Sequence, residues 1–177
     1  MKRISLFAGV AVLAVVGFLL FRPDTLFTDV RADESLEDAF GVGEVSAVAT
    51  TGTVTNTTGT VTTTTRNEIE VVLTGSFAGI DHRASGTAAI YGDGDRFVLR
   101  FEDDTDIQNG PDLYVWLLAS DSYQGGDPGE HLDLGVLTGN VGGQNYELPE
   151  GFDPALHRTV LIWCLRFAVP FAAASLS

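Results

Sequence analysis

The only cysteine of the chain, Cys164, stands in the stretch TVLIWCLRF, next to Trp163 and two residues before Arg166. The thiolate is the redox-active form of cysteine, and a guanidinium about 7 Å further along a strand favours it. Burial among apolar side chains acts in the opposite direction and raises the pKa of a thiol. The spacing therefore leaves two hypotheses open. Cys164 is a redox thiol tuned by Arg166 with Trp163 beside it, or it is an inert core residue.

Metal binding is the next chemistry to consider, because His82, His131 and His157 could join Cys164 around copper or zinc. A blue-copper site needs two histidines and a cysteine, often with a methionine. No histidine or methionine follows Cys164, and no CxxC or CxxCH motif is present. The sequence predicts no cofactor and no metal, with haem or copper as the disfavoured alternatives.

The acidic run EDDTDIQNGPD, residues 102–112, has two carboxylates at the offset that begins an EF-hand loop. Asn109 and Val115 stand where that loop requires glycine and glutamate, so the motif fails. A nucleophile elbow of the G-x-S-x-G type is also missing, which argues against a hydrolase. Whether the chain is an enzyme stays open, and a redox accessory or binding module is the better expectation.

The residues that follow position 67 have the pattern of an all-β domain. Short runs rich in Val, Ile, Leu and aromatic residues alternate with turn signals such as NGPD, GGDPG and NVGGQN. YGDGDR predicts a hairpin turn in which Gly92 and Gly94 can take positive φ. We expect residues 68–177 to form an antiparallel β-sandwich or barrel-like domain of about 8–10 short strands. Within TVLIWCLRF, alternation puts Cys164 and Arg166 on one face and Trp163 on the other.

The N-terminal region predicts a membrane anchor. Lys2 and Arg3 precede a charge-free apolar run over residues 4–21, which is about the shortest length that spans a bilayer as a helix. We therefore expect residues 1–22 to be an uncleaved signal anchor, with a cleaved signal peptide as the alternative. The basic end should stay in the cytoplasm, which places the bulk of the chain outside the cell membrane, at the cell surface.

Residues 23–67 are expected to be a linker or stalk, acidic at first and then rich in threonine. Eleven of the sixteen residues from 50 to 65 are threonine, and such a segment has little apolar area to bury. Asn56 begins an N-glycosylation pattern, so a glycosylated stalk and a plain linker are both open.

The composition limits the partners. The formal net charge is −14, and Lys2 is the sole lysine, which is typical of a halophilic, highly hydrated surface. A chain of this charge has nothing to neutralise phosphates, so nucleic acid is not expected as a partner.

Five characteristic strings follow one another along the expected β domain: GSFAGIDHRASGTAAIY, LRFED, NGPDLYVWL, LDLGVLTGNVGGQNYELP and VLIWCLRFAVPFAAASL. Together they resemble the DM13 domain, a family labelled as an electron-transfer domain. The resemblance covers residues 71–176, nearly the whole expected β domain.

This resemblance implies an extracytoplasmic all-β module, often found in membrane-anchored or secreted proteins. The characteristic cysteine of the family aligns with Cys164, and a redox or electron-transfer role has been proposed for it. The remaining candidate site residues in the matching strings are His82, Asp112, Tyr114, Asn140, Gln144, Asn145 and Tyr146. An electron-transfer role would need a separate redox or envelope protein as partner. The alternative function is a non-catalytic surface module that binds proteins or glycans, with the cysteine buried in the core.

Overall fold

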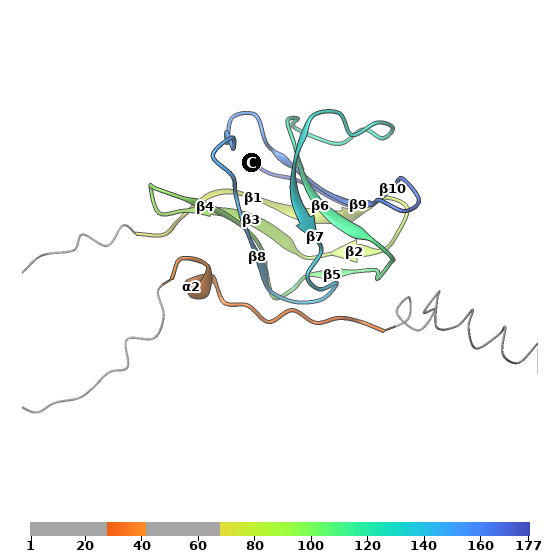
Figure 1. Cartoon of the computed structure of the whole chain (residues 1–177), viewed down its shortest axis with the longest axis horizontal. Helices are drawn as coiled ribbons and strands as arrows, with labels where there is room; N and C mark the ends of the chain where they lie inside the picture. Colours follow the sequence, from red (N-terminus) through yellow and green to blue (C-terminus); the bar gives the residue numbers. More distant parts are fainter. Residues whose placement is uncertain (1–27, 42–67) are drawn as a thin grey trace, which may run out of the picture.

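The computed structural model of the protein describes residues 28–41 and 68–177, which form one short helix and ten strands (Figure 1). The helix is α2 (Leu36–Ala39). The strands are β1 (Glu70–Gly79), β2 (Ala84–Ser85), β3 (Thr87–Gly92), β4 (Phe97–Phe101), β5 (Asp106–Ile107), β6 (Leu113–Leu118), β7 (His131–Val136), β8 (Gln144–Glu147), β9 (Thr159–Cys164) and β10 (Val169–Ser175).

Eight of these strands form one antiparallel sheet in the order β7-β6-β9-β10-β1-β3-β4-β8, and β2 pairs with β5 in a small second sheet. The large sheet curls into a nearly closed barrel (Figure 1). Its curvature has a local cause, because register shifts interrupt β1 between Val71 and Leu73 and β10 between Pro170 and Ala172. Such bulges bend a strand and increase its twist. The expected all-β antiparallel fold is confirmed, and the barrel-like form is the one adopted.

Strand β1 connects the two halves of the barrel. Its residues up to Ser76 pair with β3, and its last three residues pair with β10. At Gly75 a β-carbon would overlap the Ser175 carbonyl, so the close approach of β1 and β10 depends on glycine.

The alternation of β9 divides its side chains between two clusters. Val160, Ile162 and Cys164 belong to the interior core, whereas Leu161 and Trp163 belong to a cluster on the outer side of the sheet. All five are buried, because loops and neighbouring side chains cover the outer side as well. Fully burying one such apolar side chain contributes about 1.5–3 kcal/mol, so both clusters stabilise this strand.

The alternation stops at Cys164, where β9 ends. Leu165 and Phe167 lie in the following turn and are 51% and 63% exposed. Ala168 takes a left-handed conformation with φ 51°, which reverses the chain into β10. The face that Cys164 and Arg166 were expected to share therefore ends at the cysteine.

The hairpin between β3 and β4 forms at the expected residues. Gly94 has φ 92°, whereas Gly92 is the last residue of β3. The Asp93 carboxylate accepts hydrogen bonds from the backbone N–H groups of Arg96 at 2.9 Å and Asp95 at 3.0 Å. These bonds, led by the one from Arg96, lower the pKa of Asp93.

Residues 28–41, which we call the strap, lie along the barrel beside β8 (Figure 1). The Ala32 N–H donates to the Val141 carbonyl at 2.9 Å, and the Glu34 N–H donates to the Gly143 carbonyl at 3.0 Å. Ala32 and Phe40 are buried against the domain. The strap falls inside the range 23–67 that was expected to be linker, so part of this range is packed against the β domain.

The other expectations for the N-terminal half lie outside the described residues. They are the anchor helix over residues 1–22 and the threonine-rich segment with Asn56. Within residues 28–41 and 68–177, no helix has the length and apolar character needed to cross a membrane.

Candidate functional site

Cys164 is fully buried inside the barrel, opposite Leu113 of β6. Its Sγ donates a hydrogen bond to the Pro111 carbonyl at 3.0 Å. Thiol–disulfide exchange requires the attacking sulfur to reach a disulfide sulfur directly. An external disulfide therefore has no access to Sγ unless this end of the barrel opens locally.

Arg166 forms an ion pair with a carboxylate, whereas the thiol of Cys164 is hydrogen-bonded to a carbonyl. Its Nε lies 2.8 Å from Oδ2 of Asp112, with both side chains about half exposed. Asp112 holds the same turn through its backbone, because its carbonyl accepts the Leu165 N–H at 3.0 Å. A carboxylate thus balances the guanidinium charge that was expected to tune Cys164.

Trp163 belongs to what we call the outer aromatic cluster. This cluster consists of Trp116, Leu118, Leu161 and Trp163, with Tyr114, Tyr123 and Ala173 packed against it. The two indole rings stack with centroids 5.3 Å apart, and the His131 ring stacks on Trp116 at 4.1 Å. Tyr114 faces Trp163 across the β6–β9 pair. Trp163, a member of this cluster, directly precedes Cys164 in the sequence but lies on the opposite side of the sheet.

An open cleft of about 680 Å³ adjoins this cluster, and we call it the outer cleft. Tyr123 and Trp163 supply aromatic surface to it, and Asp81 and Asp127 supply carboxylates. Burial raises the pKa of Tyr123, and the two carboxylates raise it further. The tyrosine hydroxyl donates to the Gly126 carbonyl at 2.7 Å, which fixes the loop that forms one wall. Aromatic rings combined with negative charge suit a partner surface that carries cationic or hydrogen-bond-donating groups.

Gln144 and Tyr146 lie inside the barrel and close the loop between β7 and β8. Gln144 forms two hydrogen bonds with the backbone of Gly139. Its Nε2 donates to the Gly139 carbonyl at 2.7 Å, and its Oε1 accepts the Gly139 N–H at 3.0 Å. The Tyr146 hydroxyl donates to Gln144 Oε1 at 2.7 Å and accepts the Thr138 N–H at 3.1 Å. Burial raises the pKa of Tyr146 to about 12. In this arrangement the two side chains pair the backbone of a buried loop.

Asn140 and Asn145 bind the strap. The Asn140 side chain accepts the Val30 N–H at 2.7 Å and donates to Asp29 Oδ1 at 2.9 Å. Asn145 donates from Nδ2 to the Ser35 carbonyl at 2.8 Å. The amides that the family resemblance singled out therefore connect the strap to the barrel.

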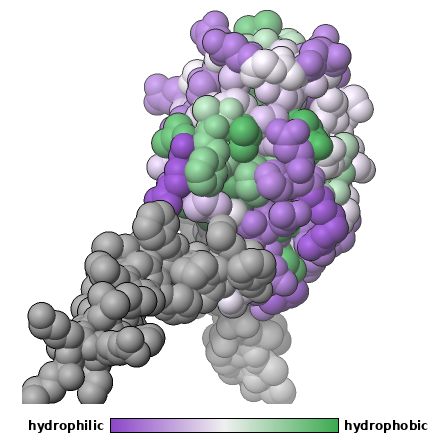
Figure 2. Space-filling view, turned by 90° about the vertical axis from the view of Figure 1, so that its right-hand side faces the viewer, coloured by the Kyte–Doolittle hydropathy of each residue, from purple (hydrophilic) through white to green (hydrophobic). Residues whose placement is uncertain are grey.

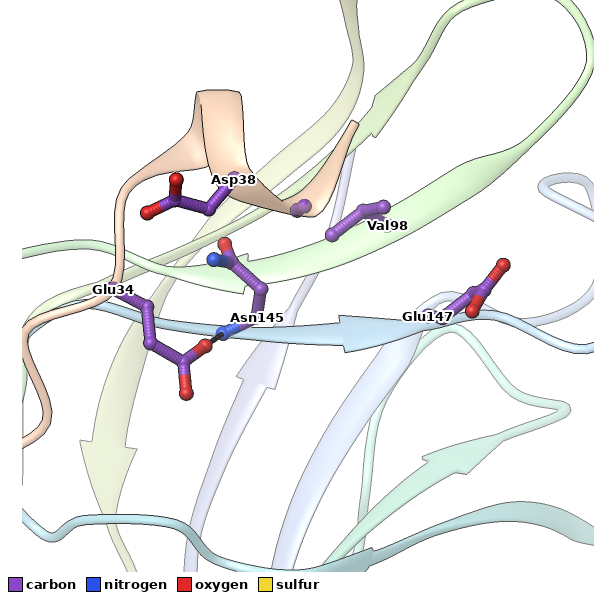
Figure 3. A pocket seen from close by; sticks show the side chains of 6 residues that line it. Glu34, Asp38, Val98, Asn145 and Glu147 are labelled. Carbon is purple, nitrogen blue, oxygen red and sulfur yellow. Dashed lines mark hydrogen bonds between the residues drawn. The ribbon is translucent and has the colours of Figure 1, made fainter. Parts of the chain in front are cut away.

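A pocket of about 300 Å³ lies between the strap and the sheet, lined in part by Glu34, Asp38 and Glu147 (Figure 3). Glu34 accepts the Asn145 backbone N–H at 2.9 Å, as the dashed line in Figure 3 shows. Three of the six residues that line the pocket, Glu34, Asp38 and Ala39, belong to the strap, so the pocket exists only while the strap is docked. Its three carboxylates give it a negative character.

Arg100 is the buried cation beside this pocket, with 6% of its surface exposed. Its guanidinium bonds to Glu102 at 2.9 Å, to Asp103 at 3.0 Å, to Asn145 Oδ1 at 3.0 Å and to the Glu34 carbonyl at 2.9 Å. Glu102 also accepts the Tyr91 hydroxyl, and burial together with this bond raises the pKa of Tyr91 to about 12. These bonds use four of the five N–H donors of the guanidinium, so the buried arginine holds the strap in place rather than awaiting an anion.

The three histidines lie in separate environments. His82 stacks on Phe171 with ring centroids 3.7 Å apart, His131 stacks on Trp116, and His157 bonds to the backbone of Asp153. In the part of the chain that the structure describes, no three His, Cys, Asp or Glu side chains are grouped so as to hold a metal ion.

Comparison with known proteins identifies the family of the β domain. A family model described as electron transfer DM13 matches residues 76–176. The chain belongs to the DM13 family. The match confirms the resemblance seen in the sequence strings and covers the barrel from within β1 to the end of β10. At the level of the family, the description indicates electron transfer. Neither a curated protein nor a solved structure matches the chain.

The sequence did not reveal that the strap would bind this DM13 domain. Asn140 and Asn145 were candidates, but their partners Val30 and Ser35 stand more than a hundred residues earlier. The glycines of NVGGQN indicated that another backbone segment could approach this loop closely, since glycine often marks such sites. At Gly142 a β-carbon would overlap the Ala32 carbonyl oxygen, so this glycine makes room for the strap.

Proposed function

We propose that the chain is a membrane-anchored, extracytoplasmic DM13 module that assists electron transfer by binding a separate redox protein. The family description supports the link to electron transfer. The apolar run over residues 4–21, preceded by Lys2 and Arg3, supports the anchor and the outside location of the domain. The net charge of −14 favours a partner with a basic surface, because complementary charge speeds association.

The closed environment of Cys164 is the observation that carries this proposal. The side chain is fully buried, its Sγ is bonded to the Pro111 carbonyl, and Arg166 is paired with Asp112. A thiol in this setting contributes packing and one hydrogen bond, and exchanges poorly with external disulfides. The redox group then belongs to the partner, and the contribution of this chain is binding and positioning.

The outer cleft is the binding surface that fits this role. Tyrosine and tryptophan are enriched where proteins bind one another, and Tyr123 lines the cleft together with the largely buried Trp163. Asp81 and Asp127 add negative charge beside them, which suits lysine or arginine side chains of a partner.

A second candidate function makes Cys164 the redox group, and the position of Trp163 favours it. An external one-electron oxidant would take an electron from Cys164 through the stacked Trp163 and Trp116, leaving a thiyl radical and releasing the thiol proton to water. The stack supplies a path, since its rings lie 5.3 Å apart. The proton has a poor exit, because the hydrogen-bond acceptor of the thiol is a carbonyl, which is not a base. The Trp116 N–H likewise has no acceptor within the described residues.

Two oxidants applied to the folded full-length chain distinguish these candidates. Glutathione disulfide tests exchange, and hexachloroiridate(IV) tests one-electron oxidation, with free thiol counted after each reaction is stopped and the chain unfolded. The binding-module proposal predicts that Cys164 survives both. Loss of thiol to the iridium oxidant, slowed by Trp163→Phe, would establish the second candidate. Rapid mixed-disulfide formation with glutathione would refute the closed thiol on which the proposal depends.

A further inference from the structure

One end of the barrel brings the start of the strap beside segments from the centre of the chain. Asn109 Nδ2 donates to the Thr28 carbonyl at 2.6 Å, and Pro111 and Asp112 follow in the same segment. Only residues 22–27 separate Thr28 from the last residue of the apolar run, Phe21. Seven residue steps span at most about 25 Å when fully extended. This end of the domain is therefore tied closely to the apolar run.

The same end carries exposed apolar side chains. Leu165 and Phe167, in the turn after β9, are 51% and 63% exposed. The turn is attached to the 109–112 segment by the Leu165 N–H bond to the Asp112 carbonyl and by the Arg166–Asp112 ion pair. We call Leu165 and Phe167 the apolar tip.

The surface around this end is mixed but contains a clear apolar area. Figure 2 faces the right-hand side of the molecule in Figure 1, where the loop between β9 and β10 lies, and shows hydrophobic residues gathered on part of that face beside hydrophilic ones. Val136, the last residue of β7, pairs with Tyr114 near the start of β6 and is 59% exposed. The Asp112 carboxylate next to the tip is paired with Arg166, which lowers the cost of bringing it near a low-polarity surface.

We infer that this end of the barrel faces the membrane and that Leu165 and Phe167 contact the interfacial layer of the bilayer. The inference rests on the anchor of the proposed function and goes beyond it, because it fixes the orientation and height of the domain. Two exposed apolar side chains on a tight turn can enter the boundary between headgroups and acyl chains, and a covalent tether of six residues holds them there.

A consequence concerns the threonine-rich segment. Near the end of the strap Phe40 is buried, with Arg96 of the barrel over its ring, so residues 42–67 connect two points of the same domain, Gly41 and Glu68. The distance between domain and membrane is then set by residues 22–27 and not by the threonine-rich segment. With the strap undocked, all of residues 22–67 would separate the domain from the apolar run.

The test measures lipid contact at two matched positions of the full-length chain in phosphatidylcholine vesicles. Phe167→Cys places a nitroxide label just after β9, and Leu156→Cys places one just before β9, at the opposite end of the same strand. Leu156 is 57% exposed and thus matches Phe167 in accessibility. The unmodified chain, taken through the same labelling, gives any Cys164 background for subtraction. Relaxation by oxygen, which enters lipid, is compared with relaxation by a water-soluble nickel chelate.

The inference predicts an oxygen-to-nickel accessibility ratio several-fold higher at position 167 than at position 156. Equal ratios in a chain that floats with the vesicles would overturn the inference and leave the anchor intact. A label at position 167 that is shielded from both reagents would also overturn it, since the tip would then contact protein, such as a second copy. A chain that does not float with the vesicles would refute the anchor itself, and the inference with it.

Discussion

Replacing Gly142 by alanine is expected to loosen the strap from the barrel. Gly142 lies beneath the strap with φ 94°, and an added β-carbon would overlap the Ala32 carbonyl oxygen. Gly135 provides a matched control, because it has the same φ of 94° and its β-carbon would meet no atom within 4 Å. Both substitutions impose the same left-handed strain, so the difference between them isolates the contact with the strap.

The size of that difference follows from the two strap N–H bonds to the residues that flank Gly142, which the added β-carbon displaces first. These are the Ala32 N–H bond to Val141 and the Glu34 N–H bond to Gly143, each contributing about 1 kcal/mol net. The total of about 2 kcal/mol corresponds to a roughly 30-fold larger population with the strap undocked.

Limited trypsin digestion measures this population at Arg31. In the docked strap Arg31 bridges to Val141, so the bond after it is held against the barrel. Cleavage there follows the open population when opening and closing are fast. Mass spectrometry of the fragment that begins at Ala32 should show about 30-fold faster cleavage for Gly142→Ala than for Gly135→Ala. Equal rates would refute the assignment of the strap as a docked element.

Three further outcomes are expected. The folded chain holds the pKa of Tyr146 at about 12 against an ordinary 10.0, so the stability it contributes is complete below pH 10 and is lost as the pH rises towards 12. Urea unfolding at several pH values should therefore show a fall that is steeper in that window, by up to about 1.4 kcal/mol per pH unit, for the unmodified chain than for Tyr146→Phe, since Tyr91 contributes to both. Cys164→Ala should keep the fold and lose about 1–2 kcal/mol of unfolding free energy by thermal denaturation, because it removes one buried sulfur and its hydrogen bond. Asp112→Asn should leave the rate of thiol labelling at Cys164 unchanged, whereas tuning by Arg166 would alter it once the ion pair is broken.

The strands were predictable because their signal is local. Alternation in TVLIWCLRF assigns Cys164 to one face and Trp163 to the other, and the structure places them in the interior core and the outer aromatic cluster. Turn residues such as Gly94 mark the ends of strands for the same reason. The extension of the alternation to Arg166 failed because Ala168 takes positive φ, which a non-glycine residue does not signal in advance.

The strap was not predictable because its binding is long-range and depends on backbone groups. Its residues show no periodic apolar pattern, and only Ala32 and Phe40 become buried. The complementary half of the contact is made by Asn140, Asn145 and the glycines between them, far along the chain. A sequence pattern indicates that such glycines allow close approach but does not say which segment approaches.

The closed state of Cys164 is tested most simply by the rate at which a thiol reagent modifies it at neutral pH. Sγ lies in a sealed interior, so modification requires an opening whose free energy approaches that of unfolding, about 5 kcal/mol or more. Labelling of the folded full-length chain should then be slower than labelling of the urea-unfolded chain by more than a thousandfold. A folded-state rate within tenfold of the unfolded rate would contradict a sealed Cys164, since it would show a thiol open to an external partner.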